Sequence, residues 1–353
     1  MNKKTLVGLG LVSVAALGLA ACGNRGASKS GASESAENGV KAAMVTDIGG
    51  VDDKSFNQSA WEGLQEWGKE NKLTKGNGFD YFQSKEEAEY VNNLNSAASK
   101  YNVIFGIGFA LKNAVESSAA ENTDKSYVII DDVIEGKDNV VSATFADHEA
   151  SYLAGVAAAK TTKTKQVGFV GGMEGEVITR FEKGFEAGVK SVDPSIKIDV
   201  QYAGSFGDAQ KGKAIAAAQY ASGADVIFQA AGGTGAGVFS EAKDVNAKRG
   251  QDDKVWVIGV DRDQAEDGKY KDKDGKESNF VLASTLKEVG ATVKDLATKA
   301  SKKEFPGGKH LTYGLKDKGV DLAETNLSDD AKAAVKEAKE GILNGKIQVP
   351  STK

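Results

Sequence analysis

Short apolar runs alternate with longer stretches of helical period from residue 41 onward. Runs rich in β-branched residues predict strands at 41–46, 79–83, 103–106, 127–131, 140–144, 166–170, 196–202, 226–229 and 255–260. Between them lie amphipathic segments such as 56–67, in which the apolar positions 56, 60, 64 and 67 share one helical face. Ser55, followed three residues later by Gln58, predicts a capping box at the start of this helix.

This alternation predicts the fold class. Nearly continuous apolar strands joined by helices are typical of parallel sheets covered on both faces. The strands form two series that break after Phe145, where an alanine-rich helix is predicted, so we expect two doubly wound α/β domains. Elements predicted at 280–284, 287–302, 311–315 and 328–344 follow the second series, which indicates that the chain recrosses between the domains.

The first residues have the pattern of a secretory signal. A basic start, Met1-Asn2-Lys3-Lys4, precedes an apolar stretch of about 15 residues, which is too short to span a bilayer comfortably. The stretch ends in Leu19-Ala20-Ala21-Cys22, which resembles the bacterial lipobox. That resemblance implies cleavage before Cys22 and lipid attachment to its sulfur. The alternative is a plain signal peptide that leaves a free thiol, but the position of the only cysteine favours lipidation.

Composition narrows the class of protein further. Residues 23–39 are rich in Gly, Ser, Ala, Asn and Glu without apolar periodicity, which predicts a flexible tether. The 353 residues carry a formal charge of −5, which argues against a nucleic-acid partner. A single cysteine excludes an intrachain disulfide framework and a Cys-rich zinc site. We therefore expect a folded body tethered outside the cytoplasmic membrane, with no metal or cofactor.

The candidate chemistry lies where strands end. In open α/β sheets ligands bind beyond the carboxyl ends of the strands, and Asp47, Asp131 and Asp261 occupy such positions. The loops after two strands carry Ser55-Phe56 and Ser205-Phe206, one pair in each domain. Two rings across a cleft would stack on a flat heterocycle, at about 1–3 kcal/mol per base. Carboxylates accept hydrogen bonds from sugar hydroxyls, so the pattern indicates a ligand of nucleoside size.

Each of these side chains also has a structural interpretation. A phenylalanine that opens a helix often packs on the core, which is favoured for Phe56 taken alone, whereas both positions remain open for Phe206. An aspartate between a strand and a helix most often caps the helix, as we expect for Asp53 and Asp208. The aspartates at the strand ends themselves precede any helix, so capping explains them less well.

The sequence does not match the known motifs for catalysis or dinucleotide binding. Gly232-Gly233-Thr234-Gly235-Ala236-Gly237 places its third glycine one position too early for a dinucleotide fingerprint, and a tight turn is the preferred interpretation. His148-Glu149 lacks the second histidine of a zinc protease, and no G-x-S-x-G elbow is present. Asp131-Asp132 could serve a glycosidase-like mechanism, but neighbouring strand residues point to opposite faces.

Several longer motifs together resemble one family. They are Asp47-Ile48-Gly49-Gly50-Val51-Asp52-Asp53-Lys54-Ser55-Phe56-Asn57, Asp147-His148-Glu149-Ala150-Ser151-Tyr152-Leu153-Ala154-Gly155, Phe169-Val170-Gly171-Gly172-Met173, Ala203-Gly204-Ser205-Phe206 and Ile258-Gly259-Val260-Asp261. With the lipobox, they resemble the basic membrane protein family of substrate-binding lipoproteins, and most closely its purine nucleoside receptors for ABC transporters.

This resemblance implies a type I periplasmic-binding-protein fold with two lobes joined by hinge crossovers. We expect residues 1–21 to be the signal peptide and 22–39 the lipidated cysteine and tether. The N-terminal lobe is then 40–146 plus 282–308, and the C-terminal lobe is 147–281 plus 309–353.

The resemblance also implies the ligand contacts, which are Asp47, Phe56, Asn57, Asp131, Phe206, Gly232, Asp261 and Lys287. The two phenylalanines would stack on a purine from opposite lobes, while Asp47 and Asn57 bind the edge of the base. Asp261 would hold the ribose hydroxyls with help from Lys287, whose alternative role is that of a solvated lysine at a helix start. The remaining aspartate and the glycine would complete the wall.

The implied function is capture without chemistry. A lipid-anchored monomer would bind a purine nucleoside of the guanosine, adenosine or inosine class and deliver it to an ABC permease and its ATPase. Two alternatives remain open, a sugar or autoinducer receptor of the same fold and a secreted nucleoside hydrolase.

Overall fold

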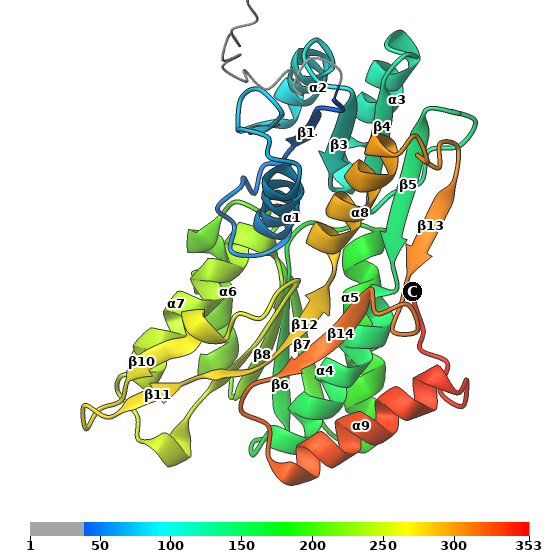
Figure 1. The fold of residues 1–353 in the computed structure, drawn as a ribbon. Helices are drawn as coiled ribbons and strands as arrows, with labels where there is room; N and C mark the ends of the chain where they lie inside the picture. The colour runs from blue at the N-terminus through cyan, green and yellow to red at the C-terminus, as the bar shows by residue number, and fades with distance from the viewer. Residues whose placement is uncertain (1–38, 353) are drawn as a thin grey trace, which may run out of the picture. The chain divides into compact units, whose positions relative to one another are not determined.

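Two six-stranded sheets form the frame of residues 39–352, the part of the chain that the computed structural model describes. The predicted signal peptide, the lipobox with Cys22 and the tether up to residue 38 lie outside these residues. Figure 1 shows how the helices cover both sheets.

The first sheet has the strand order β13-β5-β4-β3-β1-β2, and its pairs are parallel. Its strands are β1 (Ala42–Val45), β2 (Phe79–Phe82), β3 (Val103–Ile107), β4 (Ser126–Ile130), β5 (Val140–Phe145) and β13 (His310–Tyr313). Because side chains alternate along a strand, Ala42 and Met44 pack on the face covered by α1 (Phe56–Glu70) and α8 (Val289–Ser301). Ala43 and Val45 pack on the other face, under α2 (Tyr90–Ala98) and α3 (Lys112–Glu121). We call this sheet with its four helices the first lobe.

The second sheet has the order β14-β12-β9-β8-β6-β7, and only its β12–β14 pair is antiparallel among the described residues. Its strands are β6 (Gln166–Gly171), β7 (Lys197–Tyr202), β8 (Val226–Ala230), β9 (Trp256–Gly259), β12 (Val281–Lys287) and β14 (Val320–Glu324). The helices α4 (Asp147–Thr161), α5 (Glu176–Val192), α6 (Ala209–Ala221), α7 (Gly235–Asn246) and α9 (Asp329–Leu343) complete the second lobe. A hairpin of β10 (Lys269–Lys271) and β11 (Glu277–Asn279) extends from it.

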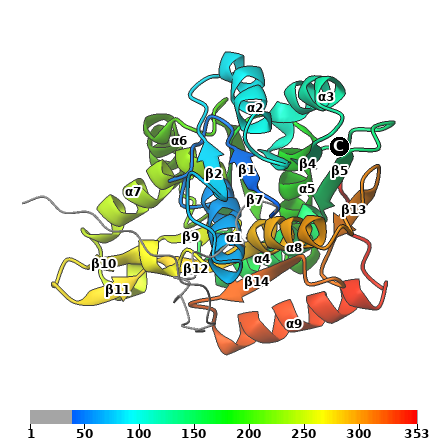
Figure 2. The same cartoon turned by 45° about the horizontal axis from the view of Figure 1, so that its top comes forward.

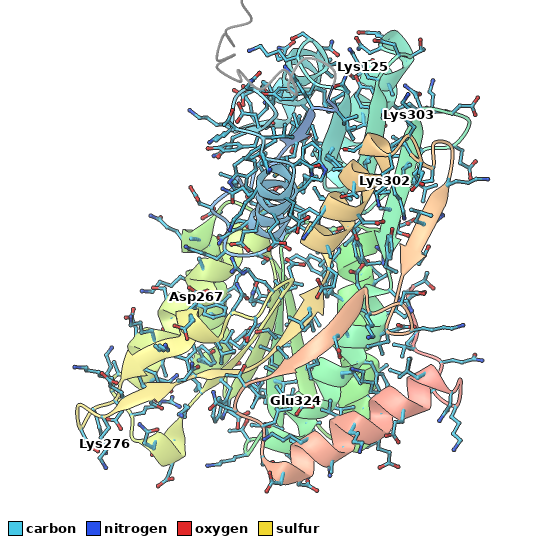
Figure 3. All side chains as sticks on the ribbon, viewed as in Figure 1. Lys125, Asp267, Lys276, Lys302, Lys303 and Glu324 are labelled. Atoms are coloured by element: carbon cyan, nitrogen blue, oxygen red, sulfur yellow. The ribbon has the colours of Figure 1, made fainter. Side chains whose placement is uncertain are left out.

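Helices pack in pairs on the sheets. In the second lobe α4 lies against α5 and α9, while α6 lies beside α7 (Figure 2). In the first lobe α8 lies beside α1, although about 230 residues of chain separate them (Figure 1). The charged surface includes Lys276, Lys302 and Glu324, all of them exposed (Figure 3). No helix of residues 39–352 is both long and apolar enough to cross a bilayer.

The chain crosses between the lobes from β5 to α4, from β12 to α8 and from β13 to β14. These crossings correct the expected lobe boundaries in two places. The sequence predicts that residues 282–287 belong to the N-terminal lobe, but β12 pairs with β9 and β14 of the second sheet. It also predicts that residues 310–313 belong to the C-terminal lobe, but β13 pairs with β5 of the first sheet. Hydrogen-bonded pairing between distant segments decides which sheet a strand joins, and local periodicity carries no information about it.

Candidate functional site

A cavity lies at the carboxyl ends of strands from both sheets. Its lining includes the complete set of sequence-predicted contacts, namely Asp47, Phe56, Asn57, Asp131, Phe206, Gly232, Asp261 and Lys287. The fold therefore brings together residues that lie far apart along the chain, from Asp47 to Lys287, as the strand-end rule for α/β sheets predicts.

Two strand ends have an unusual backbone. Asp131, directly after β4, has a φ of 72°, and Asp261, shortly after β9, has a φ of 67°. Few residues other than glycine adopt this left-handed conformation, although aspartate tolerates it better than most. Strained backbone of this kind concentrates at ligand sites, and here one such aspartate comes from each lobe.

The start of α1 is capped by Asp53, as the sequence predicts. Its carboxylate accepts the backbone N–H groups of Ser55 (2.9 Å), Asn57 (2.8 Å) and Gln58 (3.1 Å). The predicted capping box of Ser55 and Gln58 is wrong, because the Asp53 carboxylate already accepts the hydrogen bonds of the N–H groups at the start of the helix. The Ser55 hydroxyl instead donates to Asp261 of the second lobe.

The expected cap at the other phenylalanine loop is confirmed as well. The Asp208 carboxylate accepts the backbone N–H of Lys211 at 2.9 Å at the start of α6. Neither capping aspartate needs a ligand to satisfy it.

Asn57 connects this cap to the cavity wall. Its side-chain Nδ2 donates to Asp47 at 2.8 Å and to Asp53 at 2.9 Å. Its Oδ1 is buried and has no hydrogen-bond partner among the described residues. Burial raises the pKa of Asp47 to about 7, although the hydrogen bond from Asn57 opposes the shift. This corner of the cavity therefore offers an unused acceptor and a carboxyl group that titrates near neutrality.

Lys287 is the cation of the cavity wall. The alternative interpretation, a solvated lysine at a helix start, is wrong. It is 3% exposed, and its Nζ lies 2.6 Å from Asp131 Oδ2 and 3.1 Å from Asp147 Oδ1. Burial lowers its pKa, but Asp131, Asp147 and Asp261 outweigh that effect, so its pKa is raised and the ammonium stays charged.

Two further carboxyls share this region. Burial raises the pKa of Asp131, which Lys287 partly offsets, and the Asp131 Oδ1 atom has no hydrogen-bond partner among the described residues. Burial also raises the pKa of Asp261 to about 7 against the effects of Lys287 and the Ser55 hydroxyl. Buried oxygens without partners are costly, so they favour a ligand that donates hydrogen bonds.

The aromatic wall comes from both lobes. Phe56 and Phe206 are half-buried and both line the cavity, so each combines packing with exposure to the cavity. The Lys287 ammonium lies 5.1 Å from the centroid of the Phe56 ring. The Phe206 ring meets Phe109 of the first lobe edge to face, at 6.0 Å between centroids and 74° between planes. A flat ligand would enter a cavity with rings on both sides.

Sequence reasoning missed several lining residues. Gly108-Phe109 directly follows β3, so the same strand-end rule could have identified it. Val177, Ile178 and Phe181, in the first turns of α5, also line the cavity, but their spacing reads as an ordinary core-facing helix. Among residues 39–352, no cluster of three or more His, Cys, Asp or Glu side chains is arranged to hold a metal ion.

Comparison with known proteins identifies the family. Residues 40–353 match the family described as ABC transporter substrate-binding protein PnrA-like. The chain belongs to this family. It is a substrate-binding protein of the ABC transporter type, and the proteins it resembles bind solutes. The resemblance to basic membrane proteins is thereby confirmed.

Relatives from several bacteria cover most of the chain. It is 60% identical over 313 residues to the "ABC transporter nucleoside-binding protein BmpA" of Lactococcus lactis, which spans 88% of this chain and 89% of the relative. It is 34% identical over 323 residues to "Basic membrane protein A" of Borreliella burgdorferi, across 89% and 88% of the two chains.

A solved solute-binding protein of an ABC transporter system from Aeropyrum pernix superposes with a TM-score of 0.77. The match covers 89% of this chain and 94% of that one, at 24% identity. It shows the α/β type I binding-protein fold, which confirms the predicted fold class.

Proposed function

We propose that this binding protein captures purine nucleosides in the cavity between its lobes and presents them to an ABC permease. One observation carries the proposal: rings from both lobes line a cavity whose buried carboxylate and amide oxygens lack donors. The nucleoside-binding relative from Lactococcus lactis supports it, because 60% identity extends over 313 residues, 88% of this chain.

The base would lie between Phe56 and Phe206. Stacking on aromatic rings stabilises a bound base by about 1–3 kcal/mol. Asn57 Oδ1, which lacks a partner among the described residues, would accept an N–H of the base. Asp47, whose pKa is about 7, can accept an N–H as a carboxylate or donate to a ring nitrogen as an acid.

The sugar would occupy the region of Asp131, Asp261 and Lys287. Ribose hydroxyls donate to carboxylates, and the unpartnered Asp131 Oδ1 is a suitable acceptor. The Lys287 ammonium can in turn donate to a hydroxyl oxygen. Each pairing satisfies a group that is otherwise buried at a cost, which discriminates against ligands without hydroxyls.

We also propose where the protein acts and how it delivers its ligand. Binding proteins of this family act outside the cytoplasm or at the membrane, and we propose that lipid on Cys22 anchors this one. The protein would work as a monomer, closing around its ligand for delivery to the permease and its ATPase. We propose capture without catalysis, since the Asp131 and Asp261 side chains already engage Lys287 and Ser55.

Calorimetry with guanosine, adenosine, inosine and ribose tests this function. We expect nucleosides to bind and ribose to bind far more weakly. Phe206→Ala and Asp261→Ala should each weaken nucleoside affinity about 10- to 100-fold, the equivalent of losing one stack or one charged hydrogen bond. Asp295→Ala, which removes an exposed partner of Lys299, is the matched control and should bind as the wild type.

Two results would contradict the proposal. Unchanged nucleoside binding in both cavity variants, with native thermal unfolding, would show that the ligand lies elsewhere. Release of free base from inosine during prolonged incubation would identify a hydrolase rather than a receptor.

A further inference from the structure

A buried chain of charges leads from the cavity to a crossover between the lobes. Lys287 lies between Asp131, at 2.6 Å, and Asp147, at 3.1 Å. Asp147 Oδ2 accepts a hydrogen bond from Arg180 Nε at 3.0 Å, and a terminal nitrogen of the same guanidinium lies 2.9 Å from this oxygen as an ion pair. Asp131 and Lys287 line the cavity, but Asp147 and Arg180 do not. The proposed ligand contacts leave this second pair of charges without a role.

The chain of charges also joins two crossovers. Asp147 is the first residue of α4, directly after the crossover from β5, and Lys287 is the last residue of β12, directly before the crossover to α8. Two positions on, Glu149 accepts the backbone N–H of Leu315 at 2.7 Å, in the crossover between β13 and β14. The first turn of α4 therefore contacts each of the other two connections between the lobes.

The Lys287 side chain needs this support. A lysine has a flexible stem and an ammonium that is strongly hydrated in water, so once buried it depends on the charges around it to stay in one position. At 3% exposure Lys287 has little access to water, and Asp147 is 1% exposed. If the charge of Asp147 were removed, the ammonium would be paired with Asp131 alone and could shift toward Asp261, away from its present position.

We propose that Asp147, oriented by Arg180, is a positioning residue for Lys287 and couples ligand contact to the crossovers about which the lobes close. The role rests on the proposed function, since it concerns the lysine that would hold the sugar. Asp147 touches no ligand; it acts on the ligand only through Lys287.

A double-mutant cycle in the full-length protein tests the role. Asp147→Asn preserves the shape of the side chain and should weaken inosine binding about 10- to 100-fold by calorimetry. In a Lys287→Met background the same substitution should change affinity by about twofold or less, because the group it positions is gone. Asp295→Asn, at a surface pair of the same kind, should have no effect in either background. Arg180→Gln replaces Asp147→Asn if that variant does not fold, with the same expected pattern.

Hydrogen exchange on the ligand-free protein is the second measurement. The backbone N–H of Lys287 donates to the Asp261 carbonyl at 2.9 Å, so loss of positioning should speed exchange over residues 281–290. Asp147→Asn and Lys287→Met should each do so, and the double variant should add nothing further.

The outcomes separate the two proposals. Wild-type affinity in Asp147→Asn, or an equal loss in both backgrounds, would overturn the positioning role. If the wild type binds no nucleoside, the proposed function fails, and the exchange measurement alone then decides the role of Asp147. Unchanged exchange in Asp147→Asn would overturn it.

Discussion

At the scale of single residues, the cavity depends on close approaches that only small side chains permit. A Cβ atom at Gly172 would lie 2.3 Å from the Phe206 ring, well inside contact distance. Gly172 follows β6 and its backbone needs no left-handed conformation, so the requirement is for space alone. The glycine thus determines where the second-lobe ring can lie.

Gly172→Ala should displace the Phe206 ring and weaken nucleoside binding about tenfold, the equivalent of part of one stacking contact. Gly175→Ala is the matched control in the same loop, because its Cβ would lie 3.4 Å from Phe109, an ordinary contact. Isothermal titration of both variants with inosine measures the difference. Equal affinities in the two variants would show that the position of Phe206 does not matter to the ligand.

At the scale of elements, helices near the crossovers approach closely through glycine. A Cβ atom at Gly188 of α5 would lie 2.1 Å from the Tyr152 carbonyl of α4, and one at Gly184 would lie 2.3 Å from the His148 carbonyl. Gly63 of α1 meets Gly290 of α8 in the same way. These contacts are between backbones, so no side chain can move aside to relieve them. The helix α4 is therefore held rigidly against α5 in the second lobe, and α8 against α1 in the first.

Gly188→Ala should lower the free energy of unfolding, although alanine usually stabilises a helix relative to glycine. Helix propensity alone predicts that alanine stabilises by about 1 kcal/mol over glycine. The clash with α4 should instead lower the free energy of unfolding by about 1–3 kcal/mol, as overpacking does. Urea unfolding followed by circular dichroism measures the sign. An increase in stability would show that α4 and α5 can separate to admit a methyl group.

At the scale of the whole molecule, the cavity buries carboxyl groups that the unfolded chain exposes. Asp47 and Asp261 have a pKa of about 7 in the folded protein, against an ordinary value of 3.8. Between those values the folded protein retains protons that the unfolded chain has lost. The free energy of unfolding of the ligand-free protein therefore falls as pH rises from about 4 to 7.

Asp47→Asn should remove one of these contributions, of about 2–4 kcal/mol across the window, and flatten the profile. Comparing the pH dependence of urea unfolding in the variant and the wild type gives the contribution of Asp47 together with its effect on the neighbouring Asp53 and Asp131 carboxyls. A variant whose stability declines as steeply as that of the wild type would show that the Asp47 carboxyl is already ionised at pH 4–5.

The sequence by itself determined the α/β class, the strand-end aspartates, the phenylalanine loops, the caps at Asp53 and Asp208, and the family. Each depends on a local pattern: periodicity over a few residues, or a motif within one loop. Local patterns can be detected in the sequence because residues close together along the chain determine them.

Tertiary structure decided what joins distant segments. Ser55 donates to Asp261, 206 residues away, rather than completing a local capping box. Lys287 is buried against Asp131, 156 residues away, although a lysine near a helix start is usually solvated. The sheets to which β12 and β13 belong follow from pairing of the same long range. Such contacts depend on how the lobes pack, and no window along the chain contains both partners.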